Sequence, residues 1–275
     1  MTEQLNVQQM AEKLLTADDI LILCHKNPDG DTVGCGSALY YALSALDKTA
    51  AVLCSDPIPS RYAFTNPRLY KGEFEPQIVV AVDVASLQLF GENNGMPQFS
   101  RHVDLCIDHH AGNSGYAEFT LLDGTAAAAA ELLYEVLCAM GVDLTPHIAN
   151  CLYTGLSTDT GCFVYSNTTP RSHRIAAQLM DCGIDVAPVN KALFRTKSAV
   201  RLAMEARMVA DMERFDAGRV VVMQIPLSLR QELHATDADI EELSALAAQV
   251  EGTDCGVTLR ELRPGTVKLS LRTGP

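Results

Sequence analysis

Short apolar runs alternate in the first part of the chain with segments that have the spacing of helices. The runs cover residues 20–24, 50–53, 78–82 and 104–107, and a helical segment over 37–46 separates the first two. Nearly continuous apolar strands separated by helices are typical of a parallel sheet that is covered on both faces. The pattern therefore predicts an α/β fold in which helices flank a parallel sheet.

The rest of the chain divides into a helical stretch and a smaller mixed segment. Helical spacing extends over 125–140, 146–158 and 170–182, and a methionine-rich helical pattern follows over 198–213. A strand over 219–225, two helical windows around 235–237 and two strands over 255–262 and 266–272 predict a second α/β unit, which ends in a hairpin across Pro264 and Gly265. We therefore expect a domain over 1–192, a helical linker over 193–216 and a smaller domain over 217–275.

The composition excludes several classes of protein. Of the 275 residues, 48% are hydrophobic and 20% are charged, which is typical of a globular chain and not of a disordered one. With 21 basic and 34 acidic residues the formal net charge is −13, which argues against a protein that grips long nucleic acid through its phosphates. No apolar run reaches the ~18 residues of a membrane span, and the N-terminus lacks the features of a secretory signal. The nine cysteines form no CxxC pair, so we expect a cytoplasmic protein with reduced thiols.

Acidic and imidazole side chains cluster directly after the predicted strands. The first strand is followed by a segment that runs from His25 through Asp29 to Asp31, the third by Asp83, and the fourth by the triplet Asp108-His109-His110; Asp159 follows a helix. Ligands of open α/β sheets bind at the carboxyl ends of the strands, so these segments are expected to line one crevice. Histidine and carboxylate ligands without a thiolate suit manganese better than structural zinc, and one carboxylate can bridge two ions that lie ~3.5–4 Å apart.

Each of these segments has an ordinary explanation when it is taken alone. Asn27-Pro28-Asp29-Gly30 fits a turn, Asp83 fits a helix N-cap, and a pair of histidines fits an exposed surface. Gly34 and Gly36 fit either close packing of a helix or contact with a phosphate. The shared position at one end of the sheet favours a functional site.

Together the segments resemble the signature motifs of the DHH phosphoesterase superfamily, in particular its nano-RNase (oligoribonuclease) and pAp-phosphatase branch. That branch joins a DHH domain to a smaller C-terminal domain, and the resemblance covers nearly the whole chain. It implies that 1–192 is the catalytic domain and that 217–275 binds substrate. It also implies two divalent ions, most simply Mn²⁺, and a role for each motif residue. His25 and Asp29 would bind one ion, Asp31, His109 and Asp159 the other, Asp83 both, while His110 would stabilise charge at the scissile phosphate and Asp108 would orient its neighbours.

The resemblance implies a manganese-dependent hydrolase of short oligoribonucleotides and 3′-phosphoadenosine 5′-phosphate (pAp) that acts through water activated by the two ions. Hydrolysis of cyclic or linear signalling dinucleotides or of pyrophosphate is an alternative, as is a catalytically silent nucleotide-binding protein. The sequence is compatible with a homodimer. One departure concerns the glycine-rich Gly-Gly-Gly-His segment that holds the terminal nucleotide in this branch. The chain has no such segment, so we expect the smaller domain to be incomplete.

Overall fold

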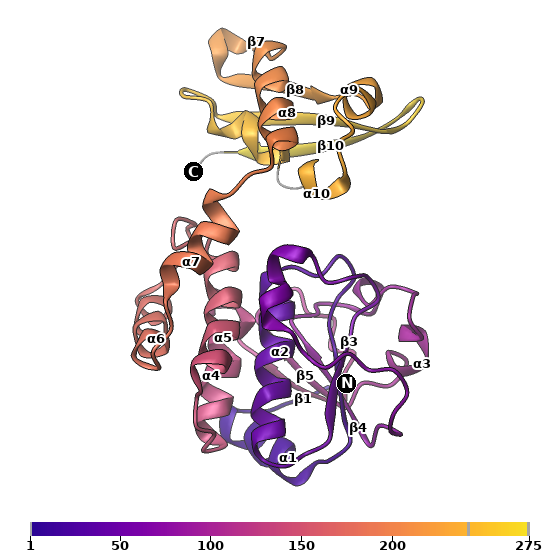
Figure 1. Ribbon diagram of the computed structural model, residues 1–275, viewed down its shortest axis with the longest axis vertical. Helices are drawn as coiled ribbons and strands as arrows, with labels where there is room; N and C mark the ends of the chain where they lie inside the picture. The colour runs from indigo at the N-terminus through magenta and orange to yellow at the C-terminus, as the bar shows by residue number, and fades with distance from the viewer. Residues whose placement is uncertain (1, 241–242, 274–275) are drawn as a thin grey trace. The chain divides into compact units, whose positions relative to one another are not determined.

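The computed structural model describes residues 2–240 and 243–273. The chain divides into two compact units, Met1–Arg195 and Thr196–Pro275 (Figure 1). Each unit is built around its own sheet, and they are described separately below. Among the described residues, no helix is both long and apolar enough to cross a bilayer.

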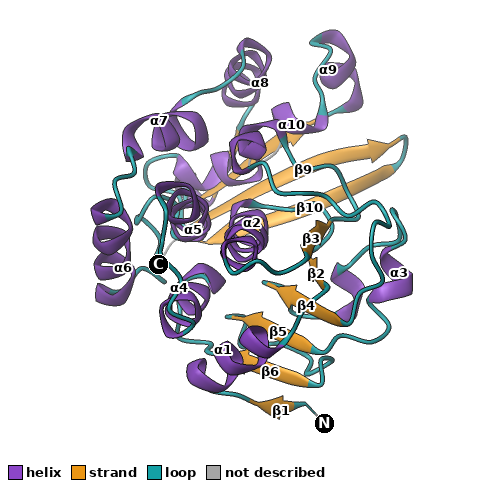
Figure 2. Cartoon of the chain, turned by 60° about the horizontal axis from the view of Figure 1, so that its bottom comes forward, coloured by secondary structure: helices purple, strands orange, loops and turns teal. Residues whose placement is uncertain are grey.

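The first unit contains the predicted parallel sheet flanked by helices, which confirms the expected fold. Its six strands lie in the order β1-β6-β5-β4-β2-β3, and every neighbouring pair is parallel (Figure 2). Two of them, β1 and β6, are short strands that the apolar pattern did not predict. The strands are β1 (Glu3–Gln4), β2 (Ile20–Leu23), β3 (Ala50–Leu53), β4 (Ile78–Val82), β5 (Leu105–Asp108) and β6 (Phe119–Leu122).

Most helices of this unit lie close to their predicted ranges, but α2 begins earlier, at Gly30. Asp29 caps it, since its Oδ1 accepts hydrogen bonds from the backbone N–H of Asp31 (3.1 Å) and of Thr32 (3.2 Å). The motif residue Asp31 therefore lies in the first helical turn. The α-helices are α1 (Val7–Thr16), α2 (Gly30–Ala45), α3 (Met96–Phe99), α4 (Ala129–Ala139), α5 (Pro146–Asp159), α6 (Pro170–Asp181) and α7 (Val186–Asn190).

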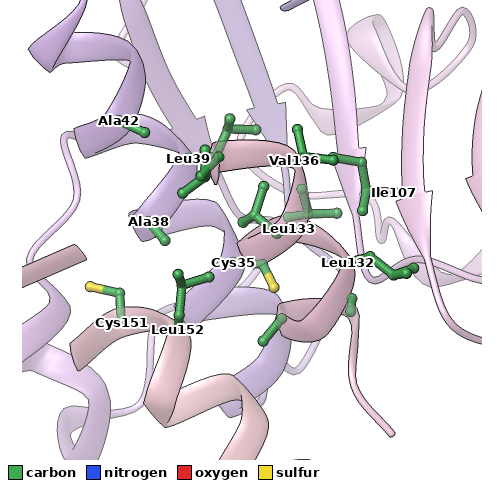
Figure 3. Packing of buried hydrophobic residues seen from close by; sticks show 14 of the residues in the cluster. Cys35, Ala38, Leu39, Ala42, Ile107, Leu132, Leu133, Val136, Cys151 and Leu152 are labelled. Carbon is green, nitrogen blue, oxygen red and sulfur yellow. The ribbon is translucent and has the colours of Figure 1, made fainter. Parts of the chain in front are cut away.

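The core of the first unit lies mainly between the sheet and the helices α1, α2, α4 and α5. Figure 3 shows side chains of α2, α4 and α5, such as Leu39, Leu133 and Leu152, which meet in this layer. The helices α2 and α5 approach each other very closely. A Cβ added at Gly34 in α2 would lie only 2.4 Å from the carbonyl oxygen of Cys151 in α5. This close approach favours the packing explanation of Gly34 over contact with a phosphate.

The second unit contains a four-stranded sheet in the order β10-β9-β8-β7. The predicted hairpin is confirmed, with β9 antiparallel to β10. The helix α8, which the sequence assigns to a linker, packs on this sheet because Met204 and Met208 are buried against Met223 and its neighbours. The elements are α8 (Ala199–Ala210), β7 (Glu213–Phe215), β8 (Val220–Ile225), α9 (Leu227–Glu232), α10 (Asp237–Ile240), β9 (Cys255–Arg263) and β10 (Thr266–Thr273).

Candidate metal centre

The site lies where the strand order of the first sheet reverses. The chain passes from β2 to β3 on one side and then continues with β4 on the other side of β2. Because all these strands are parallel, His25 after β2, Asp83 after β4 and Asp108 at the end of β5 emerge at one edge of the sheet. Such a switch point leaves a crevice between neighbouring loops, where open α/β sheets bind their ligands.

Two groups of side chains could hold metal ions and are called ligand groups below. The first consists of His25, Asp29 and Asp83, whose candidate ligand atoms lie within 4.8 Å of one another. Nε2 of His25 is 3.4 Å from Oδ1 of Asp29 and 3.7 Å from Oδ2 of Asp83. Nδ1 of His25 donates a hydrogen bond to the carbonyl oxygen of Lys26 at 2.8 Å. This bond fixes the orientation of the ring so that Nε2 faces the carboxylates, as in most histidine ligands of metal ions.

The second ligand group consists of Asp31, His109 and Asp159. Nε2 of His109 is 3.1 Å from Oδ2 of Asp159, and Nδ1 of His109 donates to the carbonyl oxygen of Ala126 at 3.2 Å. Nε2 of His109 is buried and has no hydrogen-bond partner among the described residues, although a carboxylate oxygen of Asp159 lies this close to it. Both histidines thus use Nδ1 for the backbone and present Nε2 to the crevice.

Asp31 is held by the N-terminus of a helix other than its own. The first residues of α4 have no side-chain cap from Ala128. Instead, Oδ2 of Asp31 accepts from the backbone N–H of Ala129 at 2.6 Å, and Oδ1 accepts from that of Ala130 at 3.1 Å. The helix end therefore fixes this fully buried carboxylate beside the site.

Asp83 lies between the two groups. Oδ2 faces His25, while Oδ1 lies 3.5 Å from Nε2 of His109 and 3.5 Å from Nδ1 of His110. The side chain is only 2% exposed, and Oδ1 has no hydrogen-bond partner among the described residues. The backbone φ of 58° is left-handed, which is uncommon outside glycine and is often found at functional sites.

His110 and Asp108 are arranged differently from the ligand groups. Asp108 is fully buried, and its Oδ1 accepts from Nδ1 of His110 at 2.8 Å and from the backbone N–H of His109 at 2.9 Å. Asp108 thus fixes the ring of His110, whose side chain is 46% exposed. Nε2 is the ring nitrogen of His110 that this bond leaves unused. A further group that could hold an ion consists of Asp83, His109 and His110. The nitrogen of His110 that lies 3.5 Å from Asp83 is Nδ1, and the bond to Asp108 already uses it.

The concentration of carboxylates shifts the pKa values of the site. Burial and the charge of Asp159 raise the pKa of Asp31 to about 7, and burial together with Asp31 raises that of Asp83 well above its usual range. Burial lowers the pKa of His25 and His109, but the carboxylates beside them outweigh burial and raise the values to about 10 and about 11. The site without ions therefore retains protons, which is the expected behaviour of a cluster of buried carboxylates that lacks cations.

These observations fit divalent metal ions. Two buried atoms that have no hydrogen-bond partner among the described residues, Oδ1 of Asp83 and Nε2 of His109, lie at the site. The carboxylate oxygens and imidazole nitrogens there are ligands that manganese accepts.

All eight residues singled out in the sequence lie at this edge of the sheet. Two asparagines were missed. Nδ2 of Asn113 donates to Asp108, and Nδ2 of Asn167 donates to the carbonyl oxygens of Asp159 and Ala127. The sequence carries no local signal for either, since both lie in turn-like segments.

Carboxylates and imidazoles thus gather at the switch point of a parallel sheet, in an arrangement that could hold divalent ions. The family model described as "DHH family, N-terminal domain" matches residues 19–156. The chain belongs to this family, as the motifs predicted.

Named relatives agree with this assignment. The chain is 31% identical over 262 residues to the bifunctional oligoribonuclease and PAP phosphatase NrnA of Thermus thermophilus, a match that covers 92% of this chain and 76% of that protein. It is 22% identical over 265 residues to a probable protein of the same name from Streptococcus mutans, with 95% and 83% covered. An exopolyphosphatase-related protein from Bacteroides fragilis has the same fold, with a TM-score of 0.87 at 23% identity over 98% of this chain and 83% of that chain.

Proposed function

We propose that the protein is a manganese-dependent phosphoesterase that hydrolyses short oligoribonucleotides and pAp with two metal ions. The observation that carries the metal proposal is the pair of ligand groups, His25 with Asp29 and Asp31 with His109 and Asp159, on either side of the buried Asp83. The names of the NrnA relatives support the substrate. Two divalent ions, once bound, would supply positive charge for the phosphate and acidify a water molecule.

The remaining tasks of the reaction fall to groups of the chain. The hydrogen bonds from Nδ1 of His25 and His109 to backbone carbonyls keep both rings in one orientation, so the ligands need little rearrangement. His110 is fixed by Asp108 through Nδ1, and its imidazolium form can donate a hydrogen bond from Nε2 to a phosphate oxygen as charge develops on that oxygen. The acidic surface, with a net charge of −13, disfavours long RNA and is compatible with short substrates that ions neutralise locally.

The test measures metal content and turnover on the same preparation. The protein is stripped with chelator, reloaded with Mn²⁺ or Mg²⁺, and assayed on 5′-labelled RNAs of two to five nucleotides, pAp and pyrophosphate. We expect two ions per chain, no hydrolysis in excess chelator, and better recovery with Mn²⁺ because the imidazole ligands favour it over Mg²⁺. Full activity in excess chelator would contradict the metal mechanism.

The substrate panel separates the alternatives. Turnover restricted to pyrophosphate, or hydrolysis of cyclic dinucleotides in preference to short RNA and pAp, would reassign the substrate while retaining the site. Metal binding and nucleotide binding without turnover on any of these compounds would identify a silent nucleotide-binding protein.

A further inference from the structure

Asn113 connects two of the segments that form the site. Its Nδ2 donates to Oδ2 of Asp108 at 2.6 Å and to the carbonyl oxygen of Val84 at 3.3 Å. Val84 directly follows Asp83, while Asp108 precedes the two histidines. The side-chain amide of Asn113 therefore joins the loop that carries Asp83 to the turn that carries His109 and His110.

The amide of Asn113 is itself fixed. Its Oδ1 accepts from the backbone N–H of Gly115 at 2.8 Å, and its own backbone N–H donates to the carbonyl oxygen of His110 at 2.9 Å. These bonds determine which end of the amide faces Asp108, because a reversed amide would place two acceptors against each other. The turn itself thus fixes Nδ2 of Asn113 as the donor to Asp108.

The bonds of Asp108 show what this donor does. Oδ1 of Asp108 accepts from both histidines, and Oδ2 accepts from Asn113. With both oxygens used, the carboxylate has a single orientation, and the ring of His110 follows it. A carboxylate that lost the Asn113 bond could rotate and release the ring.

We propose that Asn113 is a positioning residue for hydrolysis, which holds Asp108 so that Nε2 of His110 faces the substrate. This inference rests on the proposed function of the site. Asn113 makes no contact with either ligand group, so it acts on the rate through His110 and not on the binding of the ions.

Tyr116 provides a matched control. Its hydroxyl donates to the same carbonyl oxygen of Val84, at 2.8 Å, and contacts Sγ of Cys106 at 3.3 Å. It has no bond to Asp108. Tyr116→Phe therefore removes a part-buried hydrogen bond from the same loop without touching the Asp108–His110 pair, and reports what a purely structural loss costs.

The experiment is a double-mutant cycle on the full chain with saturating Mn²⁺ and a dinucleotide substrate. Asn113→Ala and the isosteric Asn113→Asp are measured alone and in the His110→Ala background. We expect each to lower kcat by ~10–100-fold, the usual effect of a group that orients a reactive residue, with KM and Mn²⁺ affinity within threefold of the parent. In the His110→Ala background the same substitutions should change kcat by less than twofold, and Tyr116→Phe should change it by less than threefold in either background.

Several results would overturn the inference. One is that Asn113→Ala lowers kcat as much in the His110→Ala background as in the parent protein. The others are loss of bound Mn²⁺ in Asn113→Ala, and equal effects of Asn113→Ala and Tyr116→Phe on kcat. Normal turnover of His110→Ala is a different failure, because it contradicts the role of His110 in the proposed function. In that case any kcat loss from Asn113→Ala would reject the inference as well.

Discussion

The backbone at Asp83 adopts a conformation that few side chains tolerate. A φ of 58° costs roughly 1 kcal/mol outside glycine, and aspartate is among the residues that accept it most readily. Glycine would remove this cost, but it would also remove the oxygens that face both ligand groups. The conformation therefore indicates that the carboxylate, and not the turn, determines the residue at this position.

Substitutions at Asp83 and His110 should have different effects. Asp83→Ala removes the carboxylate whose two oxygens face His25 in the first ligand group and His109 in the second, so metal content and turnover should fall together. His110→Ala should retain its metal ions and lose ~10²–10³-fold in turnover, typical for one lost charge-stabilising donor. Metal analysis and kinetics of both variants test this, and equal metal loss in the two would show that His110 is a ligand.

The sequence predicts the ligand residues better than their supports. His25, Asp83 and Asp108 follow strongly apolar runs, so strand order alone brings them to one edge. Asn113 and Asn167 act through hydrogen bonds to residues whose positions depend on the assembled sheet. No spacing rule for a single segment can identify such partners.

At the scale of elements, uninterrupted apolar runs set the strands reliably, and β3 and β4 have the bounds that the pattern predicts. Helix starts were less predictable. The helix α2 has Gly30, Gly34 and Gly36 in its first turns, and glycine has a low helix propensity. Close packing of α2 on α5 outweighs this low propensity. The start of α4 at Ala129 is set by Asp31, which lies far away in the sequence.

Gly34→Ala should destabilise the first unit. The added Cβ would lie 2.4 Å from a carbonyl oxygen and 2.9 Å from the backbone nitrogen of Gly155 in α5, and neither can move without shifting a helix. We expect a loss of about 1–3 kcal/mol in the free energy of unfolding, the usual cost of overpacking. Urea denaturation measures this loss. Gly112→Ala is the control, since an added Cβ there meets nothing within 4 Å, and a stability equal to that of Gly112→Ala would contradict the close approach of α2 and α5.

At the scale of the whole molecule, the site concentrates negative charge in an already acidic protein. The metal-free folded chain binds protons at Asp31, His25 and His109 more tightly than an unfolded chain, whose values are near 3.8 for aspartate and 6.5 for histidine. The stability that these protons provide is complete below the unfolded pKa values and is lost as the pH rises through about 7 for Asp31 and about 10 to 11 for the histidines. The metal-free protein should therefore lose stability from pH 6.5 to pH 9.

Added Mn²⁺ should reverse this loss. Metal ions replace the protons, so the gain in Tm on adding Mn²⁺ should be larger at pH 8.5 than at pH 6.5. The difference should amount to several degrees, because one pKa unit corresponds to about 1.4 kcal/mol and ~1 kcal/mol shifts Tm by about 2–4 °C in a domain of this size. Thermal denaturation at fixed free Mn²⁺ measures the gain, with Asp83→Ala as a control that should show little. A gain that is constant or falls with pH would show that these groups do not hold the ions.

The bonds of Asp31 to α4 also affect how this site can change during evolution. A chain that no longer needed its reaction could replace His109 or Asp159 without uncapping a helix, since neither side chain caps one. Replacing Asp31 by an apolar residue would leave the buried backbone N–H groups of Ala129 and Ala130 without acceptors, at a cost of about 1–3 kcal/mol for each. An inactive descendant should therefore keep aspartate at position 31 after the other ligands have changed, because both carboxylate oxygens are needed as acceptors. Position 31 would then reflect common descent of the fold, while positions 109 and 159 would reflect whether the reaction has been retained.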